Sequence, residues 1–443
     1  MKMRWQGALA SVLTTVSAGG QKNWAVIVAG SQGFWNYRHQ ADVCHAFHVV
    51  RRNGIPDERV ILMSYGDVAD CVDNPVRGTL FNKPTPTGVA GYDVSRGCKP
   101  SYSGKDVTTA NFLAVLKGDN KTTVEGKPVL RSTGDDRVFV YFTDHGAVGL
   151  VAMPVGGPLY AQDLMDALRY MWTNDMYKGL VFYLEACESG SMFEGLLPTD
   201  ANIYAVSASS SHEPSYGTYC GDNSTVDGTV IGACLGDLFS VSWLENSDVP
   251  GYFHTESLDY QYSTIRNETV KSHVHKFGTA SMGADPIEWF QGAMDFPSLG
   301  QTQTKRRSKA EEVAEIPVLR DAVNSREIKL HTLYHQLDSA TSARDQRRVE
   351  HQIDEELAAR RESGKVSRSI VRETAGRAHV PPLTGIFTKH SCLKAASTAV
   401  IAHCGPWNDY SLQYVRVLAE LCQAGYSALS IADAAERACA VVI

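Results

Sequence analysis

The sequence predicts an α/β fold, in which a mainly parallel sheet is flanked by helices, followed by an all-α unit at the carboxyl end. Short apolar runs alternate with helical patterns over the first two thirds of the chain, as they do in parallel sheets. A strongly charged segment follows, and the last 52 residues combine helical spacing with four cysteines. A chain of 443 residues, 43% of them hydrophobic, is long enough for at least two folded units.

Five apolar runs are expected to be buried strands, because each is rich in Val, Ile, Leu or aromatic residues and is soon followed by a polar residue or Gly. They are Trp24–Ala29, Val60–Met63, Val138–Phe142, Leu180–Leu184 and Ile203–Ala208. Five segments with helical spacing are expected to be helices: Tyr37–Arg52, Thr109–Leu116, Ala161–Trp172, Leu235–Leu244 and Glu256–Thr269. Ligands of such sheets bind beyond the carboxyl ends of the strands, so functional residues should follow the strands.

The carboxyl-terminal third has a different charge pattern. Residues 305–377 carry 16 basic and 13 acidic side chains, hence +3, whereas residues 1–304 carry 22 and 32, hence −10. This charge density predicts long exposed helices, which Pro381 and Pro382 end. The Ala-rich stretch from Cys392 to Val442 predicts a small helical bundle.

The ten cysteines predict disulfides and an oxidising compartment. Four of them are expected to form two bridges in the helical bundle, with the pairing left open: Cys392, Cys404, Cys422 and Cys439. One further bridge is expected between Cys220 and Cys234, and another between Cys71 and Cys98, which leaves Cys44 and Cys187. No cysteine or histidine spacing matches a zinc site, so we expect no metal and no cofactor.

Three features bear on targeting. Residues 1–20 are typical of a signal peptide, with Lys2 and Arg4 at the start and a small-residue cleavage site near Ala18. The sequons at Asn120, Asn223 and Asn267 agree with passage through the secretory pathway. The acidic net charge of −7 argues against a nucleic-acid partner, and no apolar run is long enough for a membrane span.

Polar clusters follow three of the predicted strands, and two of them predict thiol catalysis. Cys187 lies in the turn Glu185-Ala186-Cys187-Glu188-Ser189-Gly190, where backbone N–H groups are exposed. His145, at the end of another strand, is followed by Gly146, whose small size lets a substrate approach. A thiol attacks a carbonyl as thiolate and needs a nearby base and oxyanion donors, so Cys187, His145 and the N–H of Gly146 form a candidate catalytic group.

These two clusters resemble the catalytic signature of the legumains, the asparaginyl endopeptidases that include the plant vacuolar processing enzymes. The resemblance extends along the chain through Val28–Ser31, Trp35–Asp42, Phe112–Leu116, Tyr141–Gly146 and Cys234–Leu238, and it includes the spacing of the last four cysteines. The stretch Glu194–Pro198 and the Cys220 to Cys234 loop look most like the plant branch.

The resemblance implies a role for each matching residue. Cys187 is the nucleophile, His145 is the general acid and base, and Asn36 orients the imidazole. The expected pocket for an asparagine side chain consists of Arg38, His39, Glu185, Ser215 and Asp237. Such a pocket suits a primary amide, because Arg38 can donate to the amide oxygen while the carboxylates accept from the NH2 group. A protonated aspartate can replace asparagine at acidic pH, which implies weaker cleavage after Asp.

The resemblance also bears on whether peptides are cut or joined. Asp144 matches a residue that can form a succinimide in this family. Ala147 and Val148 match one stretch that influences hydrolysis against ligation, and the other matches Tyr216, Gly217 and Thr218. Gly217 is typical of proteases and Ala147 of ligases. We expect mainly hydrolysis, with peptide ligation as the alternative.

For the chain as a whole, the resemblance implies a caspase-like protease domain at 21–295, an activation segment at 296–324 and an inhibitory helical prodomain at 325–443. Asn324 is the expected self-cleavage residue. The charge split suggests an electrostatic latch that opens in the acidic vacuole or lysosome. Expected partners are proteins with an exposed Asn or Asp, the chain's own prodomain and cystatin-type inhibitors.

Two other functions are considered. A catalytically silent binding module on a caspase-like scaffold would be favoured if Cys187 or His145 were missing, and both are present. A transamidase subunit that attaches lipid anchors shares the Cys and His chemistry, but it is expected to lack the cysteine-rich tail and to carry a membrane segment.

Overall fold

The computed structural model describes residues 21–249, 255–292 and 320–440, and at its centre lies a six-stranded sheet. The strand order is β13-β8-β7-β3-β1-β2, with all neighbours parallel except the edge strand β13. The strands are β1 (Asn23–Ala29), β2 (Val60–Met63), β3 (Arg137–Thr143), β7 (Gly179–Glu185), β8 (Ile203–Ser207) and β13 (His275–Gly278). The predicted fold class is confirmed, and the five predicted strands are all present.

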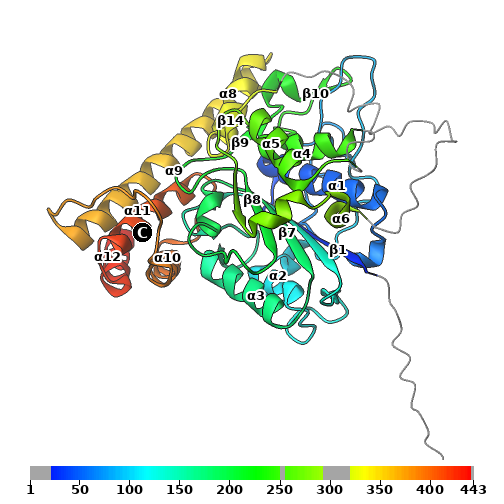
Figure 1. Cartoon of the computed structure of the whole chain (residues 1–443). Helices are drawn as coiled ribbons and strands as arrows, with labels where there is room; N and C mark the ends of the chain where they lie inside the picture. Colours follow the sequence, from blue (N-terminus) through cyan, green and yellow to red (C-terminus); the bar gives the residue numbers. More distant parts are fainter. Residues whose placement is uncertain (1–20, 250–254, 293–319, 441–443) are drawn as a thin grey trace, which may run out of the picture.

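Helices cover both faces of this sheet, as Figure 1 shows. On one face, α2 (Thr109–Leu116) and α3 (Ala161–Thr173) pack Phe112 and Leu164 against the sheet. On the other face lie α1 (Tyr37–Arg52), α4 (Leu238–Asp248), α5 (Leu258–Glu268) and α6 (Glu288–Gln291), with Val43 and Trp243 in their core. Strands with helices on both faces are buried throughout, which explains their continuous apolar sequences.

Small sheets lie beside the carboxyl ends of the central strands. One consists of β4 (Gly146–Ala147), β5 (Leu150–Val151) and β6 (Leu159–Tyr160). Another has the order β12-β9-β14 and consists of β12 (Gly236–Asp237), β9 (Tyr216–Thr218) and β14 (Val323–Asn324). The short hairpin β10 (Thr225–Val226) and β11 (Thr229–Val230) follows β9. Helix α4 begins at Leu238 rather than at the predicted Leu235, because Gly236 and Asp237 pair with β9 as a strand.

The carboxyl-terminal region is helical and lies against one side of the sheet domain (Figure 1). It comprises α8 (Ile328–Ser339), the 33-residue α9 (Ala343–Ala375), α10 (His390–Cys404), α11 (Val415–Gln423) and α12 (Ala428–Ala440). Leu393 and Val400 from α10 share an apolar cluster with Ala147, Val148 and Leu150 of the sheet domain. The last described range, residues 320–440, is called the tail from here on. It is therefore packed onto the edge at which the predicted active site lies.

The structure contains four disulfides among its described residues. The two bridges in the tail, whose pairing the sequence left open, are Cys392–Cys422 and Cys404–Cys439, and the expected Cys220–Cys234 bridge is present. The expected bridge between Cys71 and Cys98 is wrong: Cys98 pairs with Cys44, and Cys71 is free. Cys44 lies on α1, with its Cα atom 5.5 Å from that of Cys98, so a helix rather than the neighbouring loop supplies the partner.

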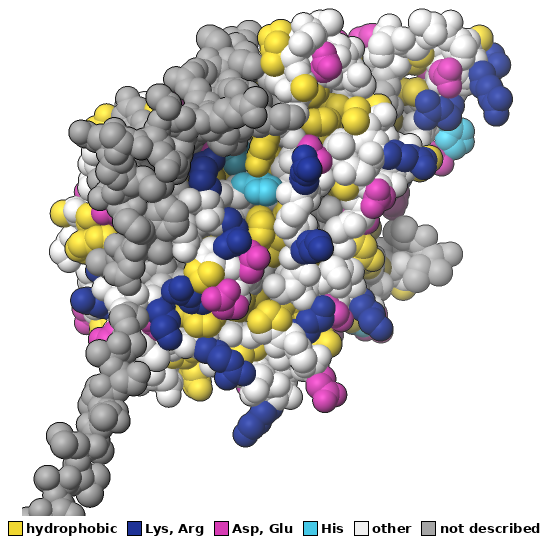
Figure 2. Space-filling view, turned by 90° about the vertical axis from the view of Figure 1, so that its right-hand side faces the viewer, with side chains coloured by type: hydrophobic (Ala, Val, Ile, Leu, Met, Phe, Trp, Pro, Cys, Tyr) yellow, Lys and Arg dark blue, Asp and Glu magenta, His cyan; other side chains and the backbone are white. Residues whose placement is uncertain are grey.

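Two sequence predictions fall outside the described residues, namely the signal peptide at 1–20 and most of the activation segment, 296–319. Among the helices that the structure does describe, none combines the length and apolarity needed to cross a bilayer. The face of the sheet domain turned away from the tail shows Lys and Arg interspersed with Asp and Glu (Figure 2).

Candidate active site

The ends of β3 and β7 bring the two catalytic candidates to the same edge of the sheet. The parallel register pairs Thr143 with Glu185, so His145 and Cys187 each lie two residues beyond that pair. The N–H of Asp144 donates to the Glu185 carbonyl, which continues the pairing into the loops. A methyl group at Gly146 would overlap the carbonyl of Cys187, so only glycine fits between the two loops.

Cys187 is buried and free. Its Sγ accepts a hydrogen bond from the N–H of Ser215 at 3.3 Å and lies 3.8 Å from the Ser215 hydroxyl. Burial raises the pKa of the Cys187 thiol above its usual value and Glu188 adds to the effect, although Arg326 opposes it. In this closed form the thiol therefore stays protonated, which is the less reactive state.

Asn36, which is expected to orient the imidazole, lies beside His145. Nε2 of the ring lies 2.7 Å from Asn36 Oδ1, while Nδ1 is buried without a hydrogen-bond partner. The Asn36 Nδ2 group donates to the Gln32 carbonyl at 3.1 Å, which turns its oxygen toward the ring. Asp409, from the loop after α10, lies 3.3 Å from His145 Nε2 and was not predicted.

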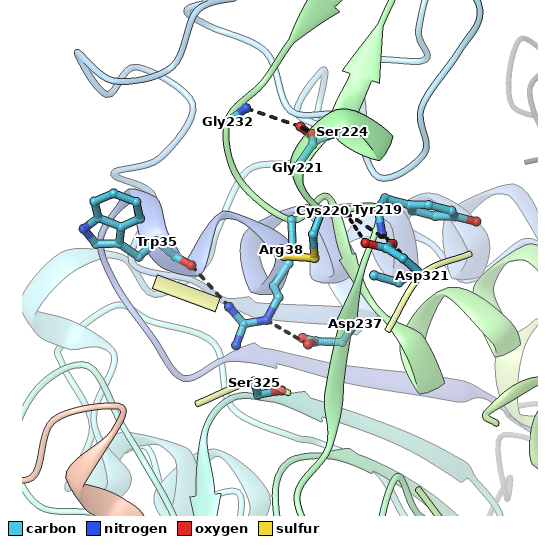
Figure 3. The surroundings of a disulfide bond; sticks show 12 residues. Trp35, Arg38, Tyr219, Cys220, Gly221, Ser224, Gly232, Asp237, Asp321 and Ser325 are labelled. Carbon is cyan, nitrogen blue, oxygen red and sulfur yellow. Dashed lines mark hydrogen bonds and ion pairs between the residues drawn. A yellow bond between two sulfur atoms is a disulfide. The ribbon is translucent and has the colours of Figure 1, made fainter. Parts of the chain in front are cut away.

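Arg38, His39 and Asp237 form a buried charged group beside these residues. Asp237 binds Arg38 Nε at 2.8 Å and His39 Nε2 at 3.2 Å, and Arg38 Nη1 donates to the Trp35 carbonyl. Figure 3 shows the guanidinium between Trp35 and Asp237, close to the disulfide of Cys220. Burial lowers the pKa of His39 to about 3, and the Arg38 charge adds to the effect, so this ring is neutral.

Glu185 and Arg38 each offer one polar atom that has no partner. Glu185 Oε2 accepts from the N–H and the hydroxyl of Ser240 at 3.1 and 3.0 Å, whereas its Oε1 is buried and unpartnered. Nη2 of Arg38 is likewise buried and unpartnered. Burial raises the pKa of Glu185 well above its usual value, and the charge of Asp237 adds to the effect. Buried polar atoms are nearly always hydrogen-bonded in native proteins, so an unpartnered guanidinium N–H and an unpartnered carboxyl oxygen in one group indicate a missing ligand.

Asp144 lies between the catalytic and pocket residues. Its Oδ1 is 3.7 Å from His39 Nδ1, and both carboxyl oxygens are buried without a hydrogen-bond partner. Burial raises the pKa of Asp144 to about 7, although the neighbouring His145 opposes the shift. The side chain is therefore largely neutral at acidic pH, and its expected succinimide chemistry stays a prediction.

Among the described residues, one group of side chains has the types and spacing of metal ligands. Atoms of His39, Asp144 and His145 lie within 4.8 Å of one another. Both ring nitrogens of His39 already face partners, Ser31 at 2.6 Å and Asp237, and His145 Nε2 faces Asn36. We assign this group to proton chemistry, and the expectation of no metal stays a prediction.

A strand from the tail covers the site. Val323 and Asn324 of β14 pair antiparallel with Gly217 and Tyr216 of β9, and the next N–H, that of Ser325, donates to the Ser215 carbonyl at 3.1 Å. The Ser325 hydroxyl also lies 3.3 Å from that of Ser215, which itself contacts Cys187. Ser325 is therefore linked to the thiol through the Ser215 hydroxyl.

The predicted self-cleavage residue is one position away from that place. Neighbouring side chains of a strand point to opposite faces, so Asn324 is turned away where Ser325 faces Ser215. The Asn324 Oδ1 accepts from the N–H of Arg326 at 3.0 Å, within its own chain. With Ser325 in this position, Arg38 Nη2 and Glu185 Oε1 have no hydrogen-bond partner.

Ion pairs between the tail and the sheet domain hold this cover in place. Arg326 binds Glu188 at 2.5 Å and the Gly146 carbonyl at 3.3 Å; Glu188 is buried, and the Arg326 side chain is 10% exposed. Arg320 binds Glu245 and Glu268 at 3.0 and 2.7 Å. A further ion pair joins Lys394 to Asp163 at 2.6 Å. The tail supplies the cation in each of these pairs, in agreement with the charge split of the sequence.

The structure also places the remaining predicted residues, whose roles stay predictions. A methyl group at Gly217 would lie 2.6 Å from Ile328 Cδ1 of α8 and 3.4 Å from Arg38 Cδ, whereas Ala147 and Val148 lie under the tail. Thr218 is buried and contacts Asp321. The sequon residues Asn120 and Asn267 are exposed and Asn223 is partly exposed.

Comparison with known proteins identifies two segments of the chain. Residues 23–293 match the Peptidase C13 family, and residues 351–439 match the legumain prodomain. The chain is 39% identical to legumain from Bos taurus over 419 residues, which are 92% of this chain and 90% of that protein. It is 35% identical to a vacuolar-processing enzyme from Vicia sativa over 433 residues, 95% of this chain and 86% of that protein. Identity to the delta-isozyme of the vacuolar-processing enzyme from Arabidopsis thaliana is 34% over 434 residues, which are 94% of this chain and 90% of that protein.

Proposed function

The chain belongs to the Peptidase C13 (legumain) family and is a cysteine endopeptidase made with a prodomain, and from this premise we propose that it cleaves peptide chains after asparagine. The observation that carries the proposal is the pair of unpartnered buried atoms, Arg38 Nη2 and Glu185 Oε1. A primary amide has an oxygen that accepts and an NH2 group that donates, so it satisfies both atoms at once.

The proposed chemistry uses Cys187 and His145. His145 Nδ1 takes the thiol proton, the sulfur attacks the carbonyl carbon after asparagine, and backbone N–H groups of Gly146 and Cys187 stabilise the oxyanion. The C–N bond breaks as His145 returns the proton to the leaving amine. Water, deprotonated by the same ring, then hydrolyses the thioester. Asn36 keeps the ring oriented through its bond to Nε2.

The cover explains how this enzyme stays inactive before processing. The closed form presents Ser325 next to Ser215 and keeps Asn324 turned onto its own chain. We propose that self-cleavage at Asn324 requires the covering strand to leave β9 and bind again one residue out of register, with asparagine in the pocket. Acidic pH favours this step by protonating Asp409, whose charged form stabilises the closed form.

The cellular setting of the proposed function is an acidic vacuole or lysosome. The name of the plant relatives, vacuolar-processing enzyme, agrees with this location. Expected partners are proteins with exposed Asn or Asp and cystatin-type inhibitors.

Analysis of cleavage products tests the proposed function. The full chain is incubated at pH about 4.5 with a peptide mixture that contains every residue type, and the cut positions are read by mass spectrometry. We expect cuts after Asn, slower cuts after Asp, no turnover by Cys187→Ala, and wild-type turnover by Cys71→Ala, which removes the other free cysteine. Equal turnover by Cys187→Ala, or cuts without preference for Asn, would contradict the proposal.

Peptide ligation is the second candidate, and the alanine at position 147 favours it. A thioester captured by an amine instead of water yields a joined peptide. Adding an amine nucleophile at neutral pH to the same assay distinguishes the two activities, and only hydrolysed product would exclude ligation.

A further inference from the structure

A chain of buried hydrogen bonds runs behind the proposed amide pocket and begins at His45, a titratable residue that the proposed mechanism does not use. Helix α1 carries Arg38, Asp42 and His45 at spacings of four and three residues, which places them on one face. His45 Nε2 lies 2.8 Å from Asp248 Oδ2 of α4, and its Nδ1 lies 2.7 Å from Asn82 Oδ1. All of these side chains are buried.

The other contacts of Asn82 fix the direction of its amide. Its Nδ2 donates to the Leu235 carbonyl at 2.9 Å and to Asp42 Oδ1 at 2.7 Å. A backbone carbonyl can only accept, so the nitrogen must face Leu235 and the oxygen must face His45. Because that oxygen can also only accept, His45 Nδ1 must carry a hydrogen.

The second ring nitrogen of His45 faces a carboxylate. Asp248 also accepts from Arg52 Nη2 at 2.7 Å, and although burial opposes its ionisation, His45 and Arg52 lower its pKa. Nε2 of His45 must therefore carry a hydrogen as well, which makes the ring an imidazolium. Burial and Arg52 oppose this charge, but Asp248 and the bond to Asn82 raise the pKa of His45 above its usual value. His48, also on α1, has a pKa that burial lowers.

The chain continues from Asn82 to the pocket. Asp42 Oδ2 accepts from the backbone N–H of Asp237 at 3.2 Å. A methyl group at Gly236 would lie 3.0 Å from Asn82 Nδ2 and 3.1 Å from Asp42 Oδ1, so this strand lies directly against both side chains. The carboxylate of Asp237 in turn holds Arg38.

We propose that His45, in its doubly protonated form, is a positioning residue for substrate recognition. It fixes the Asn82 amide, which donates to Asp42. Asp42 in turn holds the backbone N–H of Asp237, and the Asp237 carboxylate aims the guanidinium of Arg38 at the substrate amide. This inference rests on the proposed function, because it assigns the network to the asparagine pocket. The bonds of this network do not reach the thiol, although Arg38 Nη1 also lies 3.4 Å from Asn36 Oδ1, the oxygen that faces His145. The inference therefore assigns the network to substrate recognition rather than to the attacking thiol.

Two substitutions break the network at different points. Asn82→Asp keeps an acceptor for His45 but removes the donor to Leu235 and Asp42. His45→Gln has one nitrogen and cannot donate to both Asn82 and Asp248. The matched control is His48→Gln, one turn along α1, which removes a ring that hydrogen-bonds to the Val94 carbonyl and packs edge-on against Phe47 and Tyr92. Each full-length chain is incubated at acidic pH, and the active sites are counted by alkylation of the Cys187 thiol.

We expect both network variants to lose about 10- to 100-fold in kcat/KM for an Asn peptide, mainly through KM, since small misplacements in a site have effects of this size. The ratio of kcat/KM for an Asn peptide to kcat/KM for an Asp peptide should fall as well. The rate of alkylation by iodoacetamide, which needs the thiol but not the pocket, should stay within twofold of the wild type. The double variant should be no more impaired in kcat/KM than the more impaired of the two single variants, because both changes break the same series of hydrogen bonds.

Several results would overturn the inference. They are wild-type kinetics in both network variants, a parallel loss of turnover and alkylation, and a failure of both variants to yield titratable thiols while His48→Gln succeeds. A wild-type enzyme that does not cleave after Asn would contradict the proposed function itself. Nitrogen NMR of labelled histidine in the Cys187→Ala chain tests the charge, and a His45 ring with one bare nitrogen at pH 6 would also contradict the inference.

Discussion

The amide pocket and the strand that covers it lie against each other but are held by different interactions. Arg38, His39 and Asp237 are each about 1% exposed, and their bonds come from α1, the sheet edge and the buried network behind them. The cover depends on a two-residue strand and a few ion pairs, of which Arg326 to Glu188 is the most buried. We therefore expect the pocket to stay with the protease when the cover is removed, and a change in one should leave the other intact.

Breaking the Arg326 pair should give the largest effect on the cover. Arg326→Gln leaves Glu188 buried without its partner in the closed form, which costs about 3 kcal/mol or more. The open form should gain roughly 100-fold in population, and processing at pH about 6.5 should accelerate accordingly. Gel analysis of the time course measures this rate.

The control for this variant is Arg372→Gln, which removes the same charge from an exposed position on α9. It should process at the wild-type rate. After processing, kcat/KM per active site should be equal in all three proteins, because the pocket is untouched. If Arg326→Gln processed no faster than Arg372→Gln, the pair would have no role in closure.

Removing a disulfide from the tail should weaken the cover indirectly. The Cys404–Cys439 bridge closes a loop with a sequence separation of 35, and loss of such a bridge destabilises a fold by about 2 to 4 kcal/mol. The double variant Cys404→Ala with Cys439→Ala should lower the melting temperature of the tail and speed processing. Calorimetry should show the protease transition unchanged, and a shift of both transitions would contradict the separation of the two regions.

Asp409 predicts how closure depends on pH. Burial opposes its ionisation, but His145 lowers the pKa of Asp409 below its usual value in the closed form. A depressed pKa stabilises closure above the ordinary carboxyl pKa near 4, and this contribution is lost as the pH falls below about 5. Glu188 has the opposite sign, because burial raises its pKa in spite of Arg326. Acid release therefore depends on Asp409 rather than on Glu188.

The variant Asp409→Asn tests this assignment. The Asp409 side chain is 47% exposed, so solvent screening limits its contribution to about 1 kcal/mol. Processing near pH 6 should become about fivefold faster, and its dependence on pH should flatten below about pH 5. Asp433→Asn, on α12, is the charge-matched control. A pH profile identical to that of the wild type would assign acid release to other groups.

Gly217 should give the smallest effect on the cover. A methyl group there would press on Ile328 Cδ1, the movable end of a side chain, so Gly217→Ala should destabilise the closed form by under about 1 kcal/mol. The same methyl group lies beside Arg38, so the ratio of ligation to hydrolysis measured by mass spectrometry should also change. An unchanged ratio would show that this position does not influence the fate of the thioester.

The sequence predicted the parts of the molecule that local pattern determines. Strands such as Val138–Phe142 are buried on both faces, so their apolar runs identify them, and the polar residues after them follow from the fold class. The edge strand β13 was not predicted, because its residues His275–Gly278 are partly exposed and lack an apolar run. The partner of Cys98 was wrong because the pairing depends on tertiary distance.

The missed site residues share one cause. Ser325, Arg326 and Asp409 reach the active site only because the tail folds back over the sheet, and no local signal in the sequence predicts which residue of a docked segment lies where. The charge split predicted that the tail would supply cations, but not which ones. For Asn82, whose contacts span 37 to 153 residues of sequence, the same limit applies.

The central claim is that the two unpartnered atoms, Arg38 Nη2 and Glu185 Oε1, select a primary amide. Two peptides that differ only in Asn or Leu before the scissile bond test it most directly, because the side chains are of similar size and only one fills both hydrogen bonds. The account predicts that kcat/KM at pH about 5.5 favours the Asn peptide by about 10⁴-fold or more, since a site built for hydrogen bonds leaves its buried polar groups unpaired when an apolar analogue binds. A ratio below about 10 would contradict it.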